Sequence, residues 1–158
     1  MKKRLLIIAG PTAVGKTDMG IILADKLNGE IISADSMQIY KNMDIGTAKP
    51  NLKERKGVIH HLIDIINPDE NFSVAEFQRL AKGIIDDLIS NKKLPIIVGG
   101  TGLYINSLIY DMDFTQSVSN RRLREILQEE AENMGNEYIH NKLRKIDPDL
   151  ADRIHPNN

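Results

Sequence analysis

The sequence predicts an α/β fold in which a parallel β-sheet is flanked by helices, with a small helical segment at the C-terminal end. Three apolar segments of strand length alternate with three segments of helical periodicity in residues 1–113, and residues 114–158 read as helical. Crossover helices of this kind connect parallel strands, and ligands of such sheets bind beyond the carboxyl ends of the strands. We therefore expect the functional site in the loops that follow the strands.

The first two strands enclose a helix. Residues 4–9 form a short apolar run, and residues 30–34 form the second strand, which ends in Asp35. Gly29 stands where the helix needs a left-handed C-cap. The helix carries apolar residues at the spacing of one buried face: Met19, Ile22, Leu23 and Leu27.

A long polar segment follows the second strand. Residues 36–57 are rich in turn-forming residues and predict a long ordered loop, a type that is usually functional, with room for one helical turn. Residues 58–66 predict a short extended piece. Ser73 and Glu76 form a capping box that opens a helix ending near Ser90.

The third strand and the C-terminal helices complete the pattern. Residues 94–98 form a buried strand that runs into the glycine-rich segment 99–102 and then a helix. From Ser119 the sequence predicts a charged helix, and a further helix covers residues 138–146. The apolar residues of the charged helix share one face: Leu123, Ile126 and Leu127.

Composition restricts the class of protein. The chain has 158 residues, no cysteine and a net charge of −1, with 14 basic and 14 acidic residues up to Asn120 and 7 against 8 after it. No segment approaches the roughly 20 apolar residues of a membrane helix, and the first apolar run is too short for a signal peptide. We expect a soluble, cytoplasmic protein and a monomer, and the charge alone does not favour a nucleic-acid partner.

One motif carries most of the chemistry. Gly10-Pro11-Thr12-Ala13-Val14-Gly15-Lys16-Thr17 fits the P-loop pattern and lies between a strand and a helix, the context that the pattern requires. Backbone amides of such a loop surround phosphate oxygens, Lys16 adds a positive charge, and the Thr17 hydroxyl suits Mg²⁺. The chain is therefore expected to be P-loop NTPase-like and to bind a diphosphate or triphosphate, which does not by itself specify ATP.

The loop alone leaves the reaction open. A GTPase needs an Asn-Lys-x-Asp motif, and residues 91–94 lack the aspartate. A small-molecule or nucleotide kinase stays possible because its acceptor-binding aspartate also follows the second strand, as Asp35 does. Residues 96–98 run directly into glycines rather than an acidic strand end, which weakens ATP hydrolysis. A non-catalytic diphosphate or RNA-binding module is a third reading.

Several further blocks follow the P-loop in order along the whole chain: residues 35–40 (Asp-Ser-Met-Gln-Ile-Tyr), 43–50, 60–64 (His-His-Leu-Ile-Asp), 72–73, 98–104, 147–148 and 154–157. Together with the P-loop, these blocks resemble the tRNA dimethylallyltransferase family, also called tRNA isopentenyltransferases. The block from Asp35 to Pro50 is close to diagnostic.

The resemblance implies transfer of a dimethylallyl group from dimethylallyl diphosphate to N6 of adenosine-37, 3′ of the anticodon, in tRNAs reading codons that begin with U. The P-loop with Lys16 and Mg²⁺ then stabilises the departing pyrophosphate. Because the lone pair of the adenine amine is delocalised, a base must take a proton during attack, and Asp35 is the candidate. Asp35 has an alternative interpretation as a turn cap after the strand.

The same resemblance implies a tRNA-binding set. Thr101 faces the target base, and its alternative role is a helix N-cap. Arg124 matches an arginine placed against tRNA, with a solvated charged face as the alternative. The full set is Asp35, Ser36, Met37, Gln38, Thr101 and Arg124. His60 and His61 are interpreted as structural rather than as metal ligands.

The C-terminal end suggests a partial chain. His155-Pro156-Asn157-Asn158 is a helix-starting pattern with no helix after it, and family members are longer and continue with an arginine-rich helix. We expect a truncated chain that binds the diphosphate and lacks part of the tRNA contact surface.

Overall fold

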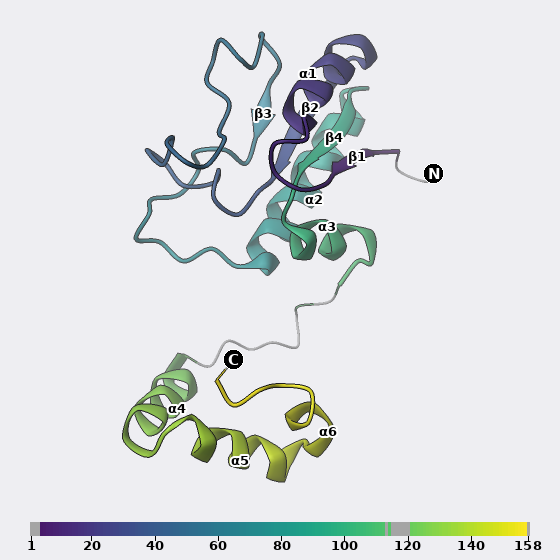
Figure 1. Cartoon of the computed structure of the whole chain (residues 1–158). Coiled ribbons are helices and arrows are strands. Elements are labelled where there is room, and N and C mark those ends of the chain that lie inside the picture. Colours follow the sequence, from purple (N-terminus) through teal and green to yellow (C-terminus); the bar gives the residue numbers. More distant parts are fainter. Residues whose placement is uncertain (1–3, 113, 115–120, 158) are drawn as a thin grey trace. The chain divides into compact units, whose positions relative to one another are not determined.

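The computed structural model describes residues 4–112, 114 and 121–157. The chain divides into two compact units, Met1–Phe114 and Thr115–Asn158 (Figure 1). The first unit contains the sheet, and the second contains helices.

A parallel sheet forms the centre of the first unit, as the sequence predicts. In the described residues its strands have the order β1-β4-β2-β3, and every pair is parallel. The short edge strand β3 lies within the extended piece expected at 58–66, so the sheet has one strand more than the three main strands expected. The bounds are β1 Leu6–Ala9, β2 Gly29–Ala34, β3 His60–His61 and β4 Leu94–Gly99.

Helices cover both faces of this sheet (Figure 1). Helix α1 (Lys16–Leu27) packs on one face, where Ile31 and Ile96 are buried. Helices α2 (Val74–Ser90) and α3 (Gly102–Ile109) cover the other face, where Ile32 and Ile97 are buried. Because successive strand residues point to opposite faces, the Ile-Ile pairs of β2 and β4 fill both cores at once.

The α2–α3 face is the larger core. The rings of Phe77 and Tyr104 stack with centroids 4.2 Å apart, and Phe72 meets Tyr104 edge-on at 6.4 Å. Helix α2 begins at the expected capping box, in which Ser73 Oγ accepts from the Glu76 amide at 3.2 Å and Glu76 Oε2 accepts from the Ser73 amide at 2.8 Å. This cap fixes where the helix starts and therefore where Phe77 enters the core.

The predicted buried face of α1 is wrong for three of its four residues. Met19, Ile22 and Leu27 are each about half exposed, at 51%, 46% and 49%, whereas Leu23 is partly buried against the core. The fully buried residues of the helix are Gly20, Ile21 and Ala24. A Cβ at Gly20 would lie 2.8 Å from Val98 Cγ2. The helix therefore approaches the sheet through its small residues, which close helix–sheet packing favours over large ones.

The left-handed cap of α1 also lies one residue earlier than expected. Asn28, with φ 51°, is the C-cap, and Gly29 already belongs to β2. A Cβ on Gly29 would lie 2.8 Å from the Leu94 carbonyl oxygen. Gly29 is thus required by the approach of β4 rather than by a turn.

The helices described in the second unit are α4 (Arg121–Met134), α5 (Asn136–Ile146) and α6 (Pro148–Ala151). Buried His140 on α5 donates from Nε2 to the carbonyls of Ala151 and Ile154 at 2.9 and 2.8 Å. This contact ties the chain after α6 back onto α5. No helix in the described part of the chain is long and apolar enough to cross a membrane.

Strands β2 and β4 approach most closely at their carboxyl ends. Gly99 pairs with Ala34, and a Cβ at Gly99 would lie 2.2 Å from the Ala34 carbonyl oxygen. No side chain fits at that distance, so the backbone of one strand has to move if Gly99 is replaced.

We expect Gly99→Ala to lower the free energy of unfolding by about 1–3 kcal/mol or more, the usual cost of overpacking. Gly83→Ala is the matched control, because an added Cβ in the middle of α2 meets nothing within 4 Å. That control should raise stability by about 0.5–1 kcal/mol, since glycine disfavours a helix interior. Urea unfolding of both variants checks this, and equal midpoints would contradict it.

Candidate functional site

The P-loop connects β1 to α1 in the form expected for an anion cradle. Ala13 and Gly15 have φ values of 66° and 83°, and α1 begins at Lys16. Left-handed residues spaced in this way turn successive backbone amides toward one point, and the first turn of the helix adds its positive end. Lys16 Nζ donates to the carbonyl of Pro11 at 2.6 Å, so the ammonium group is held beside the loop.

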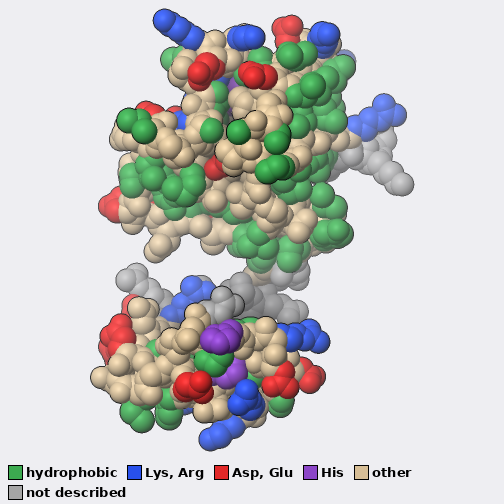
Figure 2. All heavy atoms as spheres, viewed as in Figure 1, with side chains coloured by type: hydrophobic (Ala, Val, Ile, Leu, Met, Phe, Trp, Pro, Cys, Tyr) green, Lys and Arg blue, Asp and Glu red, His purple; other side chains and the backbone are tan. Residues whose placement is uncertain are grey.

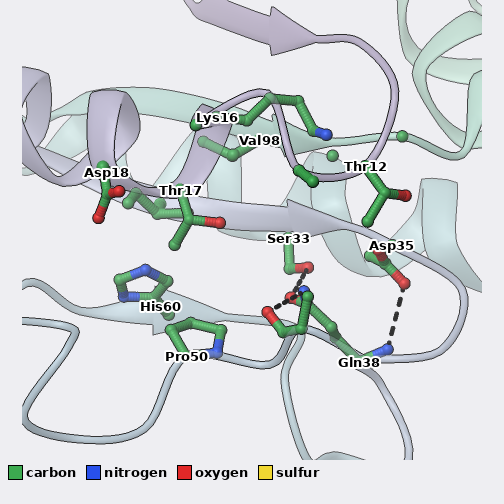
Figure 3. A pocket seen from close by; sticks show the side chains of 16 residues that line it. Thr12, Lys16, Thr17, Asp18, Ser33, Asp35, Gln38, Pro50, His60 and Val98 are labelled. Atoms are coloured by element: carbon green, nitrogen blue, oxygen red, sulfur yellow. Dashed lines mark hydrogen bonds between the residues drawn. The ribbon is translucent and has the colours of Figure 1, made fainter. Parts of the chain in front are cut away.

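A cavity of about 340 Å³ opens beside this loop (Figure 3). Strand ends β2 and β4, the P-loop and the long loop after β2 all contribute to it, which confirms the expected convergence of the three loops. Its lining residues are Thr12, Ala13, Gly15, Lys16, Thr17, Asp18, Ile31, Ser33, Asp35, Gln38, Ala48, Pro50, His60, Val98, Gly99 and Gly100. Of the predicted loop, Gly10, Pro11 and Val14 are outside this lining.

Asp35 lines the cavity at the carboxyl end of β2. Its Oδ1 accepts hydrogen bonds from the amides of Met37 and Gln38 at 2.9 and 3.3 Å. The turn-cap interpretation therefore describes a real contact. Among the described residues no hydrogen bond engages Oδ2, so one carboxylate oxygen caps the turn while the other remains available for a substrate.

Thr101 connects the ends of the two central strands. It occupies the N-cap position of α3, but its side chain makes no capping hydrogen bond. Instead Thr101 Oγ1 accepts from the Ser36 amide at 3.0 Å and donates to Ser36 Oγ at 3.3 Å. The hydroxyl thus joins two segments 65 residues apart and fixes the residue next to Asp35.

Gln38 is a structural member of the site wall. Its side chain is buried, accepts from Ser33 Oγ at 3.1 Å and donates to the carbonyl of Ala48 at 3.1 Å. These bonds hold the long loop against β2. The predicted tRNA role of Gln38 stays a prediction, and in the structure its neighbours Ser36 and Met37 are the exposed ones.

Lys49 organises the loop of residues 36–57. Its side chain is 3% exposed and donates to the carbonyl of Tyr40 at 2.8 Å, to Asp44 at 2.8 Å and to Asp64 at 2.6 Å. Burial lowers the pKa of Lys49, but the bonds to both carboxylates outweigh this and hold the pKa above its usual value. Lys49 therefore stays charged, and the predicted long loop is ordered by a buried ammonium group.

The histidine pair divides between two environments. His61 Nε2 contacts Glu30 at 2.6 Å, and Lys93 also pairs with Glu30, so His61 has the structural role expected for it. His60 instead lines the cavity, which the sequence did not predict. The sequence of two adjacent histidines does not indicate which of the two side chains lines a cavity.

The metal site predicted at Thr17 is compatible with the geometry. The Thr17 side chain lies in the cavity at the first turn of α1 (Figure 3). Within the described residues no group of three or more His, Cys, Asp or Glu is placed to hold a metal ion. One hydroxyl suits Mg²⁺ bound mainly by diphosphate oxygens and water, which is its usual coordination in phosphate sites.

The remaining predicted residue, Arg124, lies on α4 in the second unit, where it is exposed. Figure 2 shows basic and acidic side chains interspersed on the visible face of each unit. This face shows no continuous basic patch, in agreement with the balanced charge of the sequence.

A parallel sheet with a phosphate loop after its first strand, and a carboxylate after the second strand along the chain, defines a P-loop-like α/β protein. Residues 38–158 match the family model described as IPP transferase. The chain belongs to this family.

Known relatives agree with the assignment. The chain is 73% identical over all its 158 residues to a tRNA dimethylallyltransferase of Alkaliphilus oremlandii (strain OhILAs), of which it covers 50%. A crystal structure of the full-length tRNA isopentenylpyrophosphate transferase of Bacillus halodurans matches with a TM-score of 0.72 and 50% identity, over 99% of this chain and 52% of that one. A eukaryotic dimethylallyltransferase acting on tRNA matches with a TM-score of 0.83 and 37% identity, over 99% and 39%. The chain spans about half the length of the curated relatives it matches.

We expect Lys49→Met to loosen the loop of residues 36–57 by about 1–3 kcal/mol, because the Tyr40 carbonyl and Asp64 lose a buried partner. Lys41→Met is the matched control, since Lys41 belongs to the same loop and is exposed. Hydrogen exchange of the Ser36–Gly57 amides measures the effect. Protection unchanged from that of the Lys41 variant would show that Lys49 does not order the loop.

Proposed function

We propose that this chain carries the catalytic core of a tRNA dimethylallyltransferase, which moves a dimethylallyl group from dimethylallyl diphosphate to N6 of adenosine-37 in tRNA. The observation that supports this proposal most directly is that residues of the P-loop and Asp35, which follows β2, line the same cavity. Family membership and the activities for which the relatives are named support the same reaction. We extend the proposal to tRNAs reading codons that begin with U, and to a cytoplasmic protein.

The P-loop residues act on the leaving group. As the C1–O bond of the prenyl diphosphate breaks, negative charge grows on the departing pyrophosphate. The loop amides and the ammonium of Lys16 stabilise that charge, and their positions are fixed before reaction by the loop and by α1. Mg²⁺ held at Thr17 would supply further neutralisation of the diphosphate.

Asp35 acts on the nucleophile. The new bond forms between the allylic carbon and N6, and one proton leaves N6 while pyrophosphate departs with the electron pair of the C1–O bond. The Oδ2 atom of Asp35 accepts that proton, whereas Oδ1 remains bonded to the Met37 and Gln38 amides. The two hydrogen bonds hold the carboxylate in one orientation, which a base acting on a bound amine requires.

The exposed residues around Asp35 are the proposed contacts to RNA. Ser36 and Met37 are exposed beside the carboxylate, and Thr101 holds Ser36 in place. A loop base is already unpaired, so its entry into the cavity costs at most a few kcal/mol. Arg124 is proposed to contact the tRNA backbone from the second unit.

A kinase is the alternative function, and the residues at the end of β4 argue against it. That strand ends in Gly99, and Gly100 follows at the cavity, where a nucleotide-hydrolysing site of this fold commonly presents an acidic metal ligand. The two glycines offer no carboxylate for a triphosphate-bound metal.

We expect this chain with Mg²⁺ to bind dimethylallyl diphosphate at least as well as pyrophosphate and clearly better than ATP. Lys16→Ala should weaken both diphosphates about 10- to 100-fold, because a charge-assisted hydrogen bond is lost. Lys26→Ala, on an exposed position of the same helix, is the control. Titration calorimetry measures all three ligands, and a preference for ATP would favour the kinase.

We expect Asp35→Asn to lower the rate of prenyl transfer about 10²- to 10⁴-fold with little change in folding, because an amide oxygen still caps the turn but takes no proton. Asp35→Ala removes the cap as well and should also lower stability. Transfer of labelled prenyl groups to an anticodon stem-loop is measured with this chain and with a chimera completed by the C-terminal half of the 73% identical relative. Full activity of the Asn variant in the chimera would eliminate Asp35 as the base.

A further inference from the structure

His60 presents an unpaired nitrogen at the cavity. Its Nδ1 donates to the carbonyl of Val58 at 2.9 Å, which requires the proton on that nitrogen. Its Nε2 is buried and has no hydrogen-bond partner in the described part of the chain. Burial lowers the pKa of His60 and outweighs the Val58 bond that raises it, and Arg55 lowers it further. His60 is thus neutral, and the lone pair of its buried Nε2 has no partner among the described residues, although the residue lines the cavity.

The position of His60 excludes a role at the reacting atoms. His60 pairs with Ile31 on β2, whereas Asp35 follows the end of that strand four residues later. At about 3.3 Å per residue, roughly 13 Å separates the two along the strand direction. Figure 3 shows His60 on the side of Thr17 and Asp18, away from Asp35.

This side of the cavity is rich in hydrogen-bond acceptors. Thr17, Asp18 and His60 all line it. The Thr17 hydroxyl can donate to a diphosphate oxygen, but the Asp18 carboxylate and the unprotonated His60 nitrogen are acceptors with no proton to offer it. A prenyl chain also has no donor, so neither part of the proposed donor substrate satisfies Nε2.

We propose that His60 accepts a hydrogen bond from a water of the Mg²⁺ hydration shell, making it a positioning residue for the metal–diphosphate complex. Mg²⁺ keeps several waters when it binds phosphates, and these waters are strong donors. His60 lines the same cavity as Thr17, the predicted metal ligand, and this shared position is the reason for assigning His60 to the metal complex. This inference rests on the proposed function, because it assumes that a diphosphate occupies the P-loop.

Two substitutions separate the ring nitrogens. In His60→Asn the side-chain amide retains a donor for the Val58 carbonyl but has no acceptor at the position of Nε2. In His60→Gln the amide oxygen reaches about as far as Nε2 and restores an acceptor. His61→Asn is the control beside them, because His61 contacts Glu30 rather than the cavity.

Calorimetric titration of inorganic pyrophosphate, with and without Mg²⁺, measures the effect. We expect His60→Asn to reduce the Mg²⁺-dependent gain in affinity about tenfold, the loss typical when a hydrogen bond to a group bound to the metal is removed. Its metal-free affinity should not change, and His60→Gln and His61→Asn should retain most of the gain. An undiminished gain in His60→Asn, or an equal loss with and without the metal, would overturn the proposal.

A second measurement needs no variant. Nitrogen-15 NMR of labelled histidines identifies the tautomer of His60 and detects hydrogen bonding at Nε2. We expect the Nε2 resonance to move when Mg²⁺ is added to the pyrophosphate complex and to stay in place with pyrophosphate alone. If the Nε2 resonance does not change when Mg²⁺ is added, the role of His60 is refuted. If the unmodified chain does not bind pyrophosphate at all, both the proposed function and this inference are refuted.

Discussion

The site depends on the close approach of β2 and β4 at Ala34 and Gly99. These residues pair at the carboxyl ends of the strands, and the Thr101 amide donates to the Ala34 carbonyl at 3.1 Å just beyond them. Because Gly99 has no side chain, the backbones of β2 and β4 lie very close together where the two strands end. Thr101 can then reach Ser36, and Asp35 is fixed between the strand end and this hydrogen bond. The position of Asp35 therefore follows from a backbone contact inside the sheet.

The second wall of the cavity is a loop, and polar side chains hold it together with the buried side chain of Ile39. The Gln38 side chain accepts a hydrogen bond from Ser33 on β2, and Lys49 donates hydrogen bonds to the Tyr40 carbonyl and to the carboxylate of Asp64. Each contact stabilises by roughly 1 kcal/mol net, but leaving one partner buried and unpaired costs more. The wall is thus specified by a few polar contacts that all have to form together, whereas the P-loop wall is fixed by α1.

Sequence patterns predicted correctly those parts of the structure that depend on interactions between residues close together in the sequence. The P-loop, the capping box at Ser73 and the position of Asp35 depend on short-range geometry, and each is found where the sequence places it. The buried face of α1 was mispredicted because tight packing against Val98 selects Gly20 over the larger apolar residues. The role of His60 was missed because it depends on contacts with distant segments, which periodicity does not report. The long loop was predicted as ordered, but nothing in its sequence indicated that Lys49 would be buried.

The arrangement accounts for the way in which one P-loop would serve the carbon–nitrogen bond formation that we propose. In a phosphoryl transfer the reacting atom is a phosphorus held inside the loop, so acidic metal ligands must stand close to it. In prenyl transfer the loop holds only the leaving group, and the reacting carbon lies beyond it toward the strand ends. The β4 end accordingly presents glycines rather than a carboxylate, and Asp35, the proposed base, follows β2, where the nucleophile would lose its proton. Separating the anion-binding end from the base in this way keeps the negative charge of Asp35 away from the pyrophosphate that the P-loop amides and Lys16 must stabilise.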